Sequence, residues 1–315
     1  MTEGVSFRNS KYMVNVSELK FKNFSWVNTT RAAKAQMDFL AKKYNLLNED
    51  VLDVLPPTQT SKLVERPNYL FMILLLPVYH REEKHIRTEE VNFFIAENLL
   101  ITIHNDKIPV MKNVLDGCRK NSKQCVNIVY ALYAVLESLL NYCYPLLRHI
   151  NEDMEKVEAK LFKQFEKKET VEEILRIKTN IFDFERAVAS HEYILNKLAG
   201  TAIRFFPTGE LEKNFVNLVE IAKEIRLSLT GHKDMINSLH ETNATLVEYR
   251  VNQIIKTLTV FAVITFPLTL VAALFSMQTD ATPIVGTPFD FWKITGAIIA
   301  AALVMLGIFR WRRWI

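Results

Sequence analysis

Two almost uncharged segments close the chain and decide its class. Residues 257–279 read TLTVFAVITFPLTLVAALFSMQT without a charged side chain, and residues 291–309 are apolar except for Lys293. An apolar helix of about 20 residues spans the roughly 30 Å hydrocarbon core of a bilayer. The pattern predicts an α-helical membrane protein with two C-terminal spans behind a mostly polar head.

The charges around these segments predict their orientation. Arg250 and Lys256 precede the first span, and the basic tail 310–315 follows the second, whereas the loop 280–290 carries Asp280 and Asp290. Excess Lys and Arg stay on the cytoplasmic side, so both termini are expected there and the loop outside. No leader or transit segment opens the sequence, which predicts a bacterial protein of the cell (inner) membrane.

Composition narrows the function further. The net charge of +4 lies mostly near the membrane ends, which favours contact with membrane lipids over nucleic acid. Neither a Walker loop nor a G-x-G-x-x-G motif occurs, so no enzyme or nucleotide-driven pump and no organic cofactor is indicated. Cys118, Cys125 and Cys143 form no C-x-x-C pair, which predicts a reduced head without a zinc site or a disulfide framework.

The first part of the head, residues 1–123, reads as a cytoplasmic α/β domain. Apolar runs predict strands over 69–79, 91–94 and 99–103, and the 11–24 stretch is expected to supply others. Helices are expected over 30–44 and 48–55, and prolines end the second of them. Residues 58–68 are polar and predict a loop.

The rest of the head reads as helical. Residues 124–209 predict a helical hairpin, in which apolar residues at spacings of three and four from Leu132 to Leu161 form one stripe and a second helix covers 171–198. No proline then occurs between residue 210 and Pro267. One helix about 100 Å long is therefore expected from 210 to about 275. Its 210–256 part is a stalk that leads into the first span.

Two spans of one subunit cannot enclose an aqueous pore, so several copies are needed if the protein conducts. One face of the first span carries a line of small, hydroxyl and apolar residues at heptad-like spacing: Asn252, Ile255, Thr259, Ala262, Phe266, Thr269 and Ala273. A ring of such helices would line a narrow, uncharged channel. Ordinary helix packing favours the same residue types, so the pattern alone leaves both interpretations open.

Three segments resemble the CorA family of divalent-cation channels, which are homopentamers. They are VNQIIKTLTVFAVITFPLTLVAALF (251–275), RTEEVNFFIAENLLITIH (87–104) and the tail RWRRWI (310–315). The resemblance covers nearly the whole chain. It implies a funnel-shaped homopentamer with an α/β cytoplasmic head, a very long stalk helix, two transmembrane helices and Mg²⁺ as the transported ion.

The signature that closes the first span differs from the family pattern. Ser276, Met277 and Gln278 stand where the family has Gly-Met-Asn. The resemblance implies that this segment is the selectivity filter and that Leu258 and Phe266 form a hydrophobic gate. Gln278 keeps an amide oxygen but is one methylene longer than asparagine. Asp280 and Asp290 are expected to concentrate cations at the outer mouth.

The resemblance also implies regulatory cation sites between neighbouring heads, where Mg²⁺ would screen facing acids. Asp53 matches one member of the family pair, and the other position is the neutral Asn217, with Glu220 and Glu241 further along the helix. We expect a weakened or relocated Mg²⁺ sensor. The alternative is that Asp53 only occupies a helix terminus.

The sequence therefore predicts voltage-driven transport of a divalent cation into the cytoplasm through a pentameric pore. Mg²⁺ is favoured, and Co²⁺ or Ni²⁺ would also pass. Two alternatives remain. One is a Zn²⁺ transporter of the ZntB type, coupled to protons, and the other is a non-conducting membrane-anchored scaffold or sensor.

Overall fold

The computed structural model describes residues 4–6, 16–30, 33–55, 60–105, 108–120, 125–164, 168–205, 211–277, 286 and 288–312. The chain divides into two compact units, residues 1–240 and residues 241–315. The first unit is an α/β head, and the second contains the end of one long helix and the last helix of the chain.

A mixed sheet forms the centre of the first unit. Its described strands are β1 (Gly4–Ser6), β2 (Val16–Lys20), β3 (Ser25–Thr30), β4 (Lys62–Glu65), β5 (Leu70–His80), β6 (His85–Ala96) and β7 (Leu99–His104). They lie in the order β1-β2-β3-β7-β6-β5-β4, and all neighbours are antiparallel except β3 and β7. The three apolar runs predicted as strands are β5, β6 and β7, so that prediction is confirmed.

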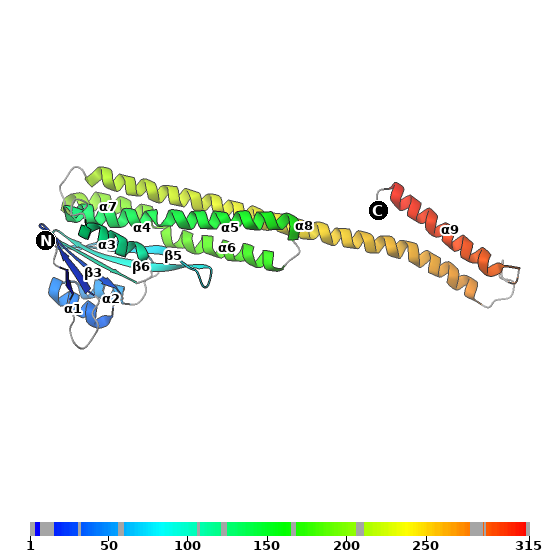
Figure 1. Ribbon diagram of the computed structural model, residues 1–315, viewed down its shortest axis with the longest axis horizontal. Coiled ribbons are helices and arrows are strands. Elements are labelled where there is room, and N and C mark those ends of the chain that lie inside the picture. Colours follow the sequence, from blue (N-terminus) through cyan, green and yellow to red (C-terminus); the bar gives the residue numbers. More distant parts are fainter. Residues whose placement is uncertain are drawn as a thin grey trace. The chain divides into compact units, whose positions relative to one another are not determined.

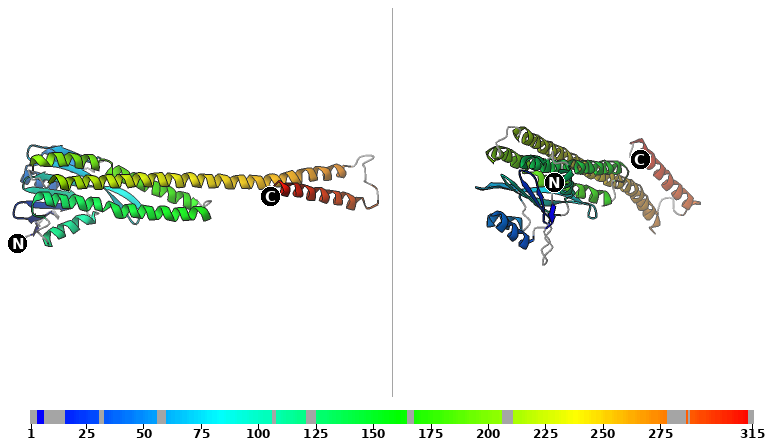
Figure 2. Two further views of the ribbon diagram at one scale, coloured as in Figure 1. Left: turned by 90° about the horizontal axis from the view of Figure 1, so that it is seen from above. Right: turned by 60° about the vertical axis from the view of Figure 1, so that its left-hand side comes forward.

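Helices cover both faces of this sheet (Figures 1 and 2). On one face, α1 (Lys34–Tyr44) and α2 (Asn48–Val54) bury Met37, Leu40 and Val51 against Phe71 and Ile101 of the sheet. On the other face, α4 (Ile128–Asn141), α6 (Lys168–Val188) and α7 (His191–Phe205) contact β4 to β7. Because both faces are covered, β5 is apolar along nearly its whole length instead of alternating.

The predicted apolar stripe lies on two consecutive helices, α4 and α5 (Cys143–Gln164). Its members are buried, apart from the half-buried Tyr142 between the helices. α4 ends at Asn141, four residues before Pro145. Proline lacks the N–H that would bond to the Asn141 carbonyl, and its ring crowds that carbonyl.

The single helix predicted over 171–198 is wrong. The structure has α6, a turn at Ala189 and Ser190, and then α7. No proline or glycine lies at this break. The reason is tertiary: the first residue of α7, His191, is buried and its Nε2 lies 2.7 Å from the backbone oxygen of Leu75 in β5.

The loop predicted over 58–68 is also wrong, because it contains β4. The polar strand is held by its pairing with β5 and by α7, whose Lys197 Nζ donates to the Leu63 backbone oxygen at 2.9 Å. Sequence reasoning also missed β3 and the helix α3 (Pro109–Lys120).

The cysteine expectation needs a correction too. Cys118 at the end of α3 and Cys125 before α4 form a disulfide, with their Cα atoms 5.7 Å apart. The positions of α3 and α4 bring these two residues together, which their spacing in the sequence did not suggest. Cys143 is free and buried.

The long helix is confirmed. α8 runs from Leu211 to Ser276 without interruption at Gly231 or Pro267, against a predicted range of 210 to about 275. The last helix, α9, covers Asp290–Trp311. Among the described residues, α8 and α9 are the two helices long and apolar enough to cross a membrane.

Buried His191 predicts a pH dependence of the head's stability. Burial lowers the pKa of His191 to about 4 from an ordinary 6.5, although its hydrogen bond to Leu75 works in the opposite direction. The neutral ring is therefore tolerated above pH 6.5. As the pH falls from 6.5 towards 4, the unfolded chain binds a proton that the folded chain refuses, at a cost approaching roughly 3 kcal/mol.

We expect His191→Gln, which keeps a donor for Leu75, to reduce this dependence. The measurement is the thermal unfolding midpoint of the purified full-length protein in detergent at pH 7 and pH 4.5. The native chain should lose more stability than the variant between these values, and an equal loss would contradict the assignment to His191.

Candidate ion pathway and regulatory site

The predicted pore line lies on an open face of α8. Of its seven residues, six are exposed and only Ala262 is partly covered. Phe266 has 73% of its surface accessible, more than Ile255 with 54%. The single chain therefore leaves this face without a partner in its second unit.

The opposite side of the same segment is covered only in part, because Thr257, Pro267 and Leu274 on it are exposed. Its buried or half-buried residues also recur at helical spacing: Gln253, Lys256, Val260, Ile264, Leu268 and Phe275. With 3.6 residues per turn, the centres of the two lines lie roughly 160° apart around the helix axis. α8 thus has one side on which exposed and half-buried residues mix, and one face, called the bare face from here on, on which six of the seven line residues are exposed.

The threonine hydroxyls on the bare face can act as uncharged hydrogen-bond acceptors. Thr259 Oγ1 donates to the Ile255 backbone oxygen at 2.8 Å, and Thr269 Oγ1 donates to the Thr265 backbone oxygen at 2.8 Å. With their hydrogens directed into the helix, these hydroxyls keep lone pairs for an incoming donor such as a cation's water. Outside this line, Pro267 leaves the backbone oxygen of Val263 without a helical partner, because proline has no N–H.

The end of α8 is described only in part. Ser276 is its last residue, and the Met277 N–H donates to the Leu274 backbone oxygen at 3.3 Å while its side chain is exposed. Gln278 and Asp280 lie outside the described residues. The filter and one of the two outer acids therefore remain predictions.

Asp290, the other predicted outer acid, starts α9. Its Oδ2 accepts from the Gly286 N–H at 3.1 Å and its Oδ1 accepts from the Phe291 N–H at 2.7 Å. A carboxylate is favourable at the N-terminus of a helix, where backbone N–H groups lack helical partners. Asp290 thus has a structural role at this helix start, and its role at the outer mouth stays a prediction.

In the head, Asp50, Arg66 and Tyr69 form a hydrogen-bonded group, called the clamp from here on, that positions α2. Asp50 is fully buried, and its carboxylate accepts from Arg66 Nε at 3.0 Å, from Arg66 Nη2 at 2.6 Å and from the Tyr69 hydroxyl at 2.6 Å. The hydrogen bond to Asp50 raises the pKa of Arg66. Burial, followed by the bond to Asp50, raises the pKa of Tyr69 to about 12. The clamp joins α2 to the β4–β5 turn.

The clamp fixes Asp53, which lies one turn further along α2. Its carboxylate forms an ion pair with Lys62 Nζ of β4. Lys62 Nζ also lies 5.4 Å from the centre of the Phe71 ring. Both charged side chains are only partly exposed, so the proposed Mg²⁺ ligand already has a cationic neighbour within its own chain.

The partner position in α8 is engaged as well. Asn217 Nδ2 donates to the Tyr133 hydroxyl at 3.0 Å, and this hydroxyl donates to Glu137 Oε1 at 2.7 Å. Glu220 forms an ion pair with Lys223 at 2.9 Å. Glu241 lies in the second unit, and its backbone oxygen accepts from Thr245.

Lys62, Tyr133 and Glu137 were missed by sequence reasoning. Lys62 lies nine residues from Asp53, and Tyr133 is 84 positions from Asn217. Neither separation is a helical or strand spacing. Only the packing of β4 beside α2 and of α4 beside α8 brings them together.

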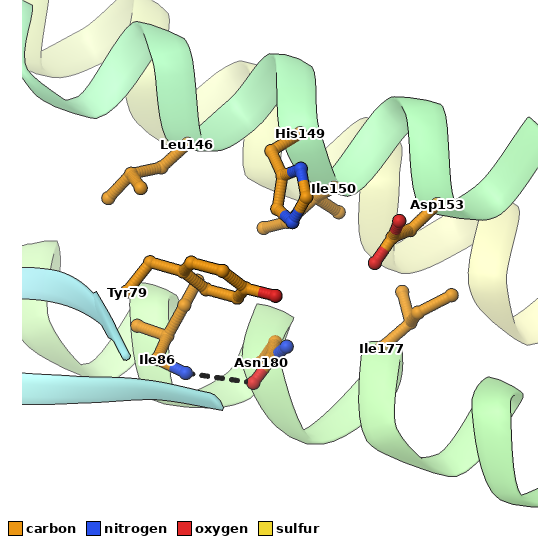
Figure 3. Close-up of a pocket in the computed structure, with 8 residues that line it drawn as sticks. All are labelled: Tyr79, Ile86, Leu146, His149, Ile150, Asp153, Ile177 and Asn180. Carbon is orange, nitrogen blue, oxygen red and sulfur yellow. Dashed lines mark hydrogen bonds between the residues drawn. The ribbon is translucent and has the colours of Figure 1, made fainter. Parts of the chain in front are cut away.

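α5 carries an acidic stretch (Glu152, Asp153, Glu155 and Glu158), of which Asp153 lines a closely packed site between α5, α6 and the β5–β6 hairpin (Figure 3). His149 and Tyr79 meet edge to face across it, with ring centres 4.7 Å apart. Burial would raise the pKa of Asp153, but hydrogen bonds from Arg176 at 2.9 Å and Lys156 at 3.2 Å lower it. Asp153 is thus an ionised partner of a cation within its own chain.

No cluster of three or more His, Cys, Asp or Glu side chains able to hold a metal ion occurs within the described part of one chain. The predicted site residues Asp53 and Asn217 lie on different elements, α2 and α8, with separate partners. A regulatory site built from them would need more than one copy, as the resemblance implies.

Comparisons with known proteins agree with this architecture. The family model described as "CorA-like Mg2+ transporter protein" matches residues 21–312. The "Cobalt/magnesium transport protein CorA" of Methanocaldococcus jannaschii is 22% identical over 308 residues, which cover 95% of each chain.

Solved structures share the fold. The complete CorA magnesium transporter of M. jannaschii matches with a TM-score of 0.85 and 20% identity, over 100% of this chain and 98% of that one. The cytoplasmic domain of ZntB from Vibrio parahaemolyticus matches with a TM-score of 0.61 and 9% identity, over 74% of this chain and 94% of that one. With a family model that spans nearly all of its residues, the chain belongs to the CorA-like Mg²⁺ transporter family, as the sequence indicated.

Proposed function

We propose that this protein forms a funnel-shaped homopentamer that conducts divalent cations into the cytoplasm, with Mg²⁺ favoured and Co²⁺ or Ni²⁺ also accepted. The family is one of transporters, so transport rather than catalysis is the activity at that level. The M. jannaschii relative carries cobalt and magnesium in its name, which supports this choice of ions.

The bare face of α8 is the observation that carries the proposal. The oxygen acceptors on this face are better satisfied by water or by other helices than by lipid, and two spans cannot surround water by themselves. Five copies arranged with their bare faces inward would enclose a lumen lined by Asn252, Thr259 and Thr269 and narrowed at Phe266. The half-covered faces would then point outward.

The chemistry of this lumen suits hydrated Mg²⁺. The ion releases its waters reluctantly and is usually bound through them. Uncharged oxygen acceptors at water distance meet that need, whereas a carboxylate in a narrow membrane pore would be costly. A membrane voltage that is negative inside supplies about 4.6 kcal/mol per 100 mV for a divalent ion, twice the value for a single charge.

The cytoplasmic sensor in our proposal is weak. Asp53 of one copy would face Asn217, Glu220 or Glu241 of the next, with Mg²⁺ between them. Lys62 and Lys223 already neutralise Asp53 and Glu220 in part. Mg²⁺ would have to displace or share these ammonium groups, so the site should respond only to high Mg²⁺.

The first test is ion uptake. Purified protein in proteoliposomes should take up Mg²⁺ in response to voltage and independently of a pH gradient, and Gln278→Asn should keep or raise this flux. Zn²⁺ uptake that follows the proton gradient would instead favour the ZntB-type alternative. A folded oligomer without flux, in native and Gln278→Asn forms, would favour the scaffold.

The second test concerns the gate. Phe266→Ala replaces an aromatic ring by a methyl group in the proposed constriction, so the lumen should be wider and easier to wet. We expect Mg²⁺ uptake to rise several-fold. Val263→Ala is the control on the same helix outside the line. An unchanged flux in Phe266→Ala would contradict the inward position of this ring.

The third test concerns the sensor. Lys62→Gln removes the ammonium that competes with Mg²⁺ at Asp53, and exposed or partly exposed ion pairs are worth up to about 1 kcal/mol. The Mg²⁺ concentration that protects the head from protease should therefore fall by up to about fivefold. Asp53→Asn should abolish the response, while Lys43→Gln, which breaks the pair with Glu18, should leave it unchanged. If Asp53→Asn keeps the native response, Asp53 is not a ligand.

A further inference from the structure

A groove of about 640 Å³ runs along α8 at the place where the predicted stalk enters the predicted span. Its described lining extends from Tyr249 to Phe261. At 1.5 Å per residue this is about 18 Å along the helix axis. All of these residues belong to the second unit of the chain.

The groove changes from polar to apolar along its length. At one end lie Tyr249, Arg250 and Gln253, and Gln253 Nε2 donates to the Tyr249 hydroxyl at 2.8 Å. At the other end, Ile254 and Phe261 are large apolar side chains with 58% and 64% of their surface exposed. The predicted span begins at residue 257, between Ile254 and Phe261.

The groove lies away from the proposed pore. With 3.6 residues per turn, its lining is centred roughly 150° from the line that contains Thr259 and Phe266. Leu258, which the resemblance places in the gate, is the lining residue nearest to that line. A ligand in the groove would therefore face the surrounding bilayer and not the lumen.

A phospholipid, like this groove, has a polar end followed by an apolar one. Its phosphodiester is an anion that a guanidinium and neighbouring hydroxyl and amide donors can bind, and its acyl chains need an apolar surface. Tyrosine side chains are favoured at the level of the head groups. Free phosphate would use only the polar end and would leave Ile254 and Phe261 in contact with nothing.

We infer that this groove binds an anionic phospholipid, with its phosphate beside Arg250, Tyr249 and Gln253 and an acyl chain along Ile254 and Phe261. Arg250 supplies the charge selectivity, since one basic side chain near the surface of an anionic membrane contributes about 1 kcal/mol. The bound lipid would cover the α8 surface at the membrane boundary that the groove leaves open.

The test is native mass spectrometry of the delipidated full-length protein in detergent, titrated with dioleoyl phosphatidylglycerol. The spectrum also reports the number of subunits, so the folded state of each variant is checked at once. Arg250→Gln should weaken phosphatidylglycerol binding about fivefold. Lys256→Gln removes the same charge outside the groove lining and should change it less than twofold.

A second variant tests the apolar end of the groove. Phe261→Ala should weaken binding of the dioleoyl lipid but leave a short-chain dihexanoyl phosphatidylglycerol unaffected. Equal effects of Arg250→Gln and Lys256→Gln would overturn the site in favour of diffuse surface attraction. Displacement of the lipid by inorganic phosphate, or equal binding of phosphatidylcholine, would overturn it as well. None of these readouts depends on ion flux, so they stand or fall separately from the proposed transport.

Discussion

The bare face of α8 is the constraint on which the functional interpretation depends. Within the second unit, the chain partly covers a line through Val260 and Leu268 and leaves the line through Thr259 and Phe266 open. Apolar side chains on a membrane helix can face lipid, but uncharged oxygen acceptors interleaved with them are better satisfied by water or by other helices. The line of oxygen acceptors on this exposed helix, more than exposure alone, favours a ring of copies with these faces inward.

In the head, hydrogen bonds and ion pairs hold the carboxylates of α2 in place. Asp50 is buried because Arg66 and Tyr69 satisfy its oxygens, and this clamp orients α2 and with it Asp53. Removing one partner of a buried, hydrogen-bonded carboxylate is far more costly than losing an exposed ion pair. We therefore assign Asp50 a structural role. The ion pair of Asp53 and Lys62 is partly exposed, so it can exchange partners and is suited to regulation.

The chain belongs to the family but differs from its signature at residues 276–278. The fold, the two spans and the long helix follow the family from end to end. The filter residues are the part of the chain where the family pattern changes and where the structure describes only Ser276 and Met277. Flux measurements on Gln278 variants therefore test the choice of ion directly.

The sequence by itself determined the two spans, the long helix, the three central strands and the apolar stripe, because each is a run or a periodic pattern whose local preference agrees with its final burial. Tertiary structure alone decided the rest. The break before His191, the strand β4, the Cys118–Cys125 disulfide and the pairing of Lys62 with Asp53 depend on groups from different elements. Such contacts have no period in the sequence, since they arise only when packing brings distant or unpatterned residues to the same place.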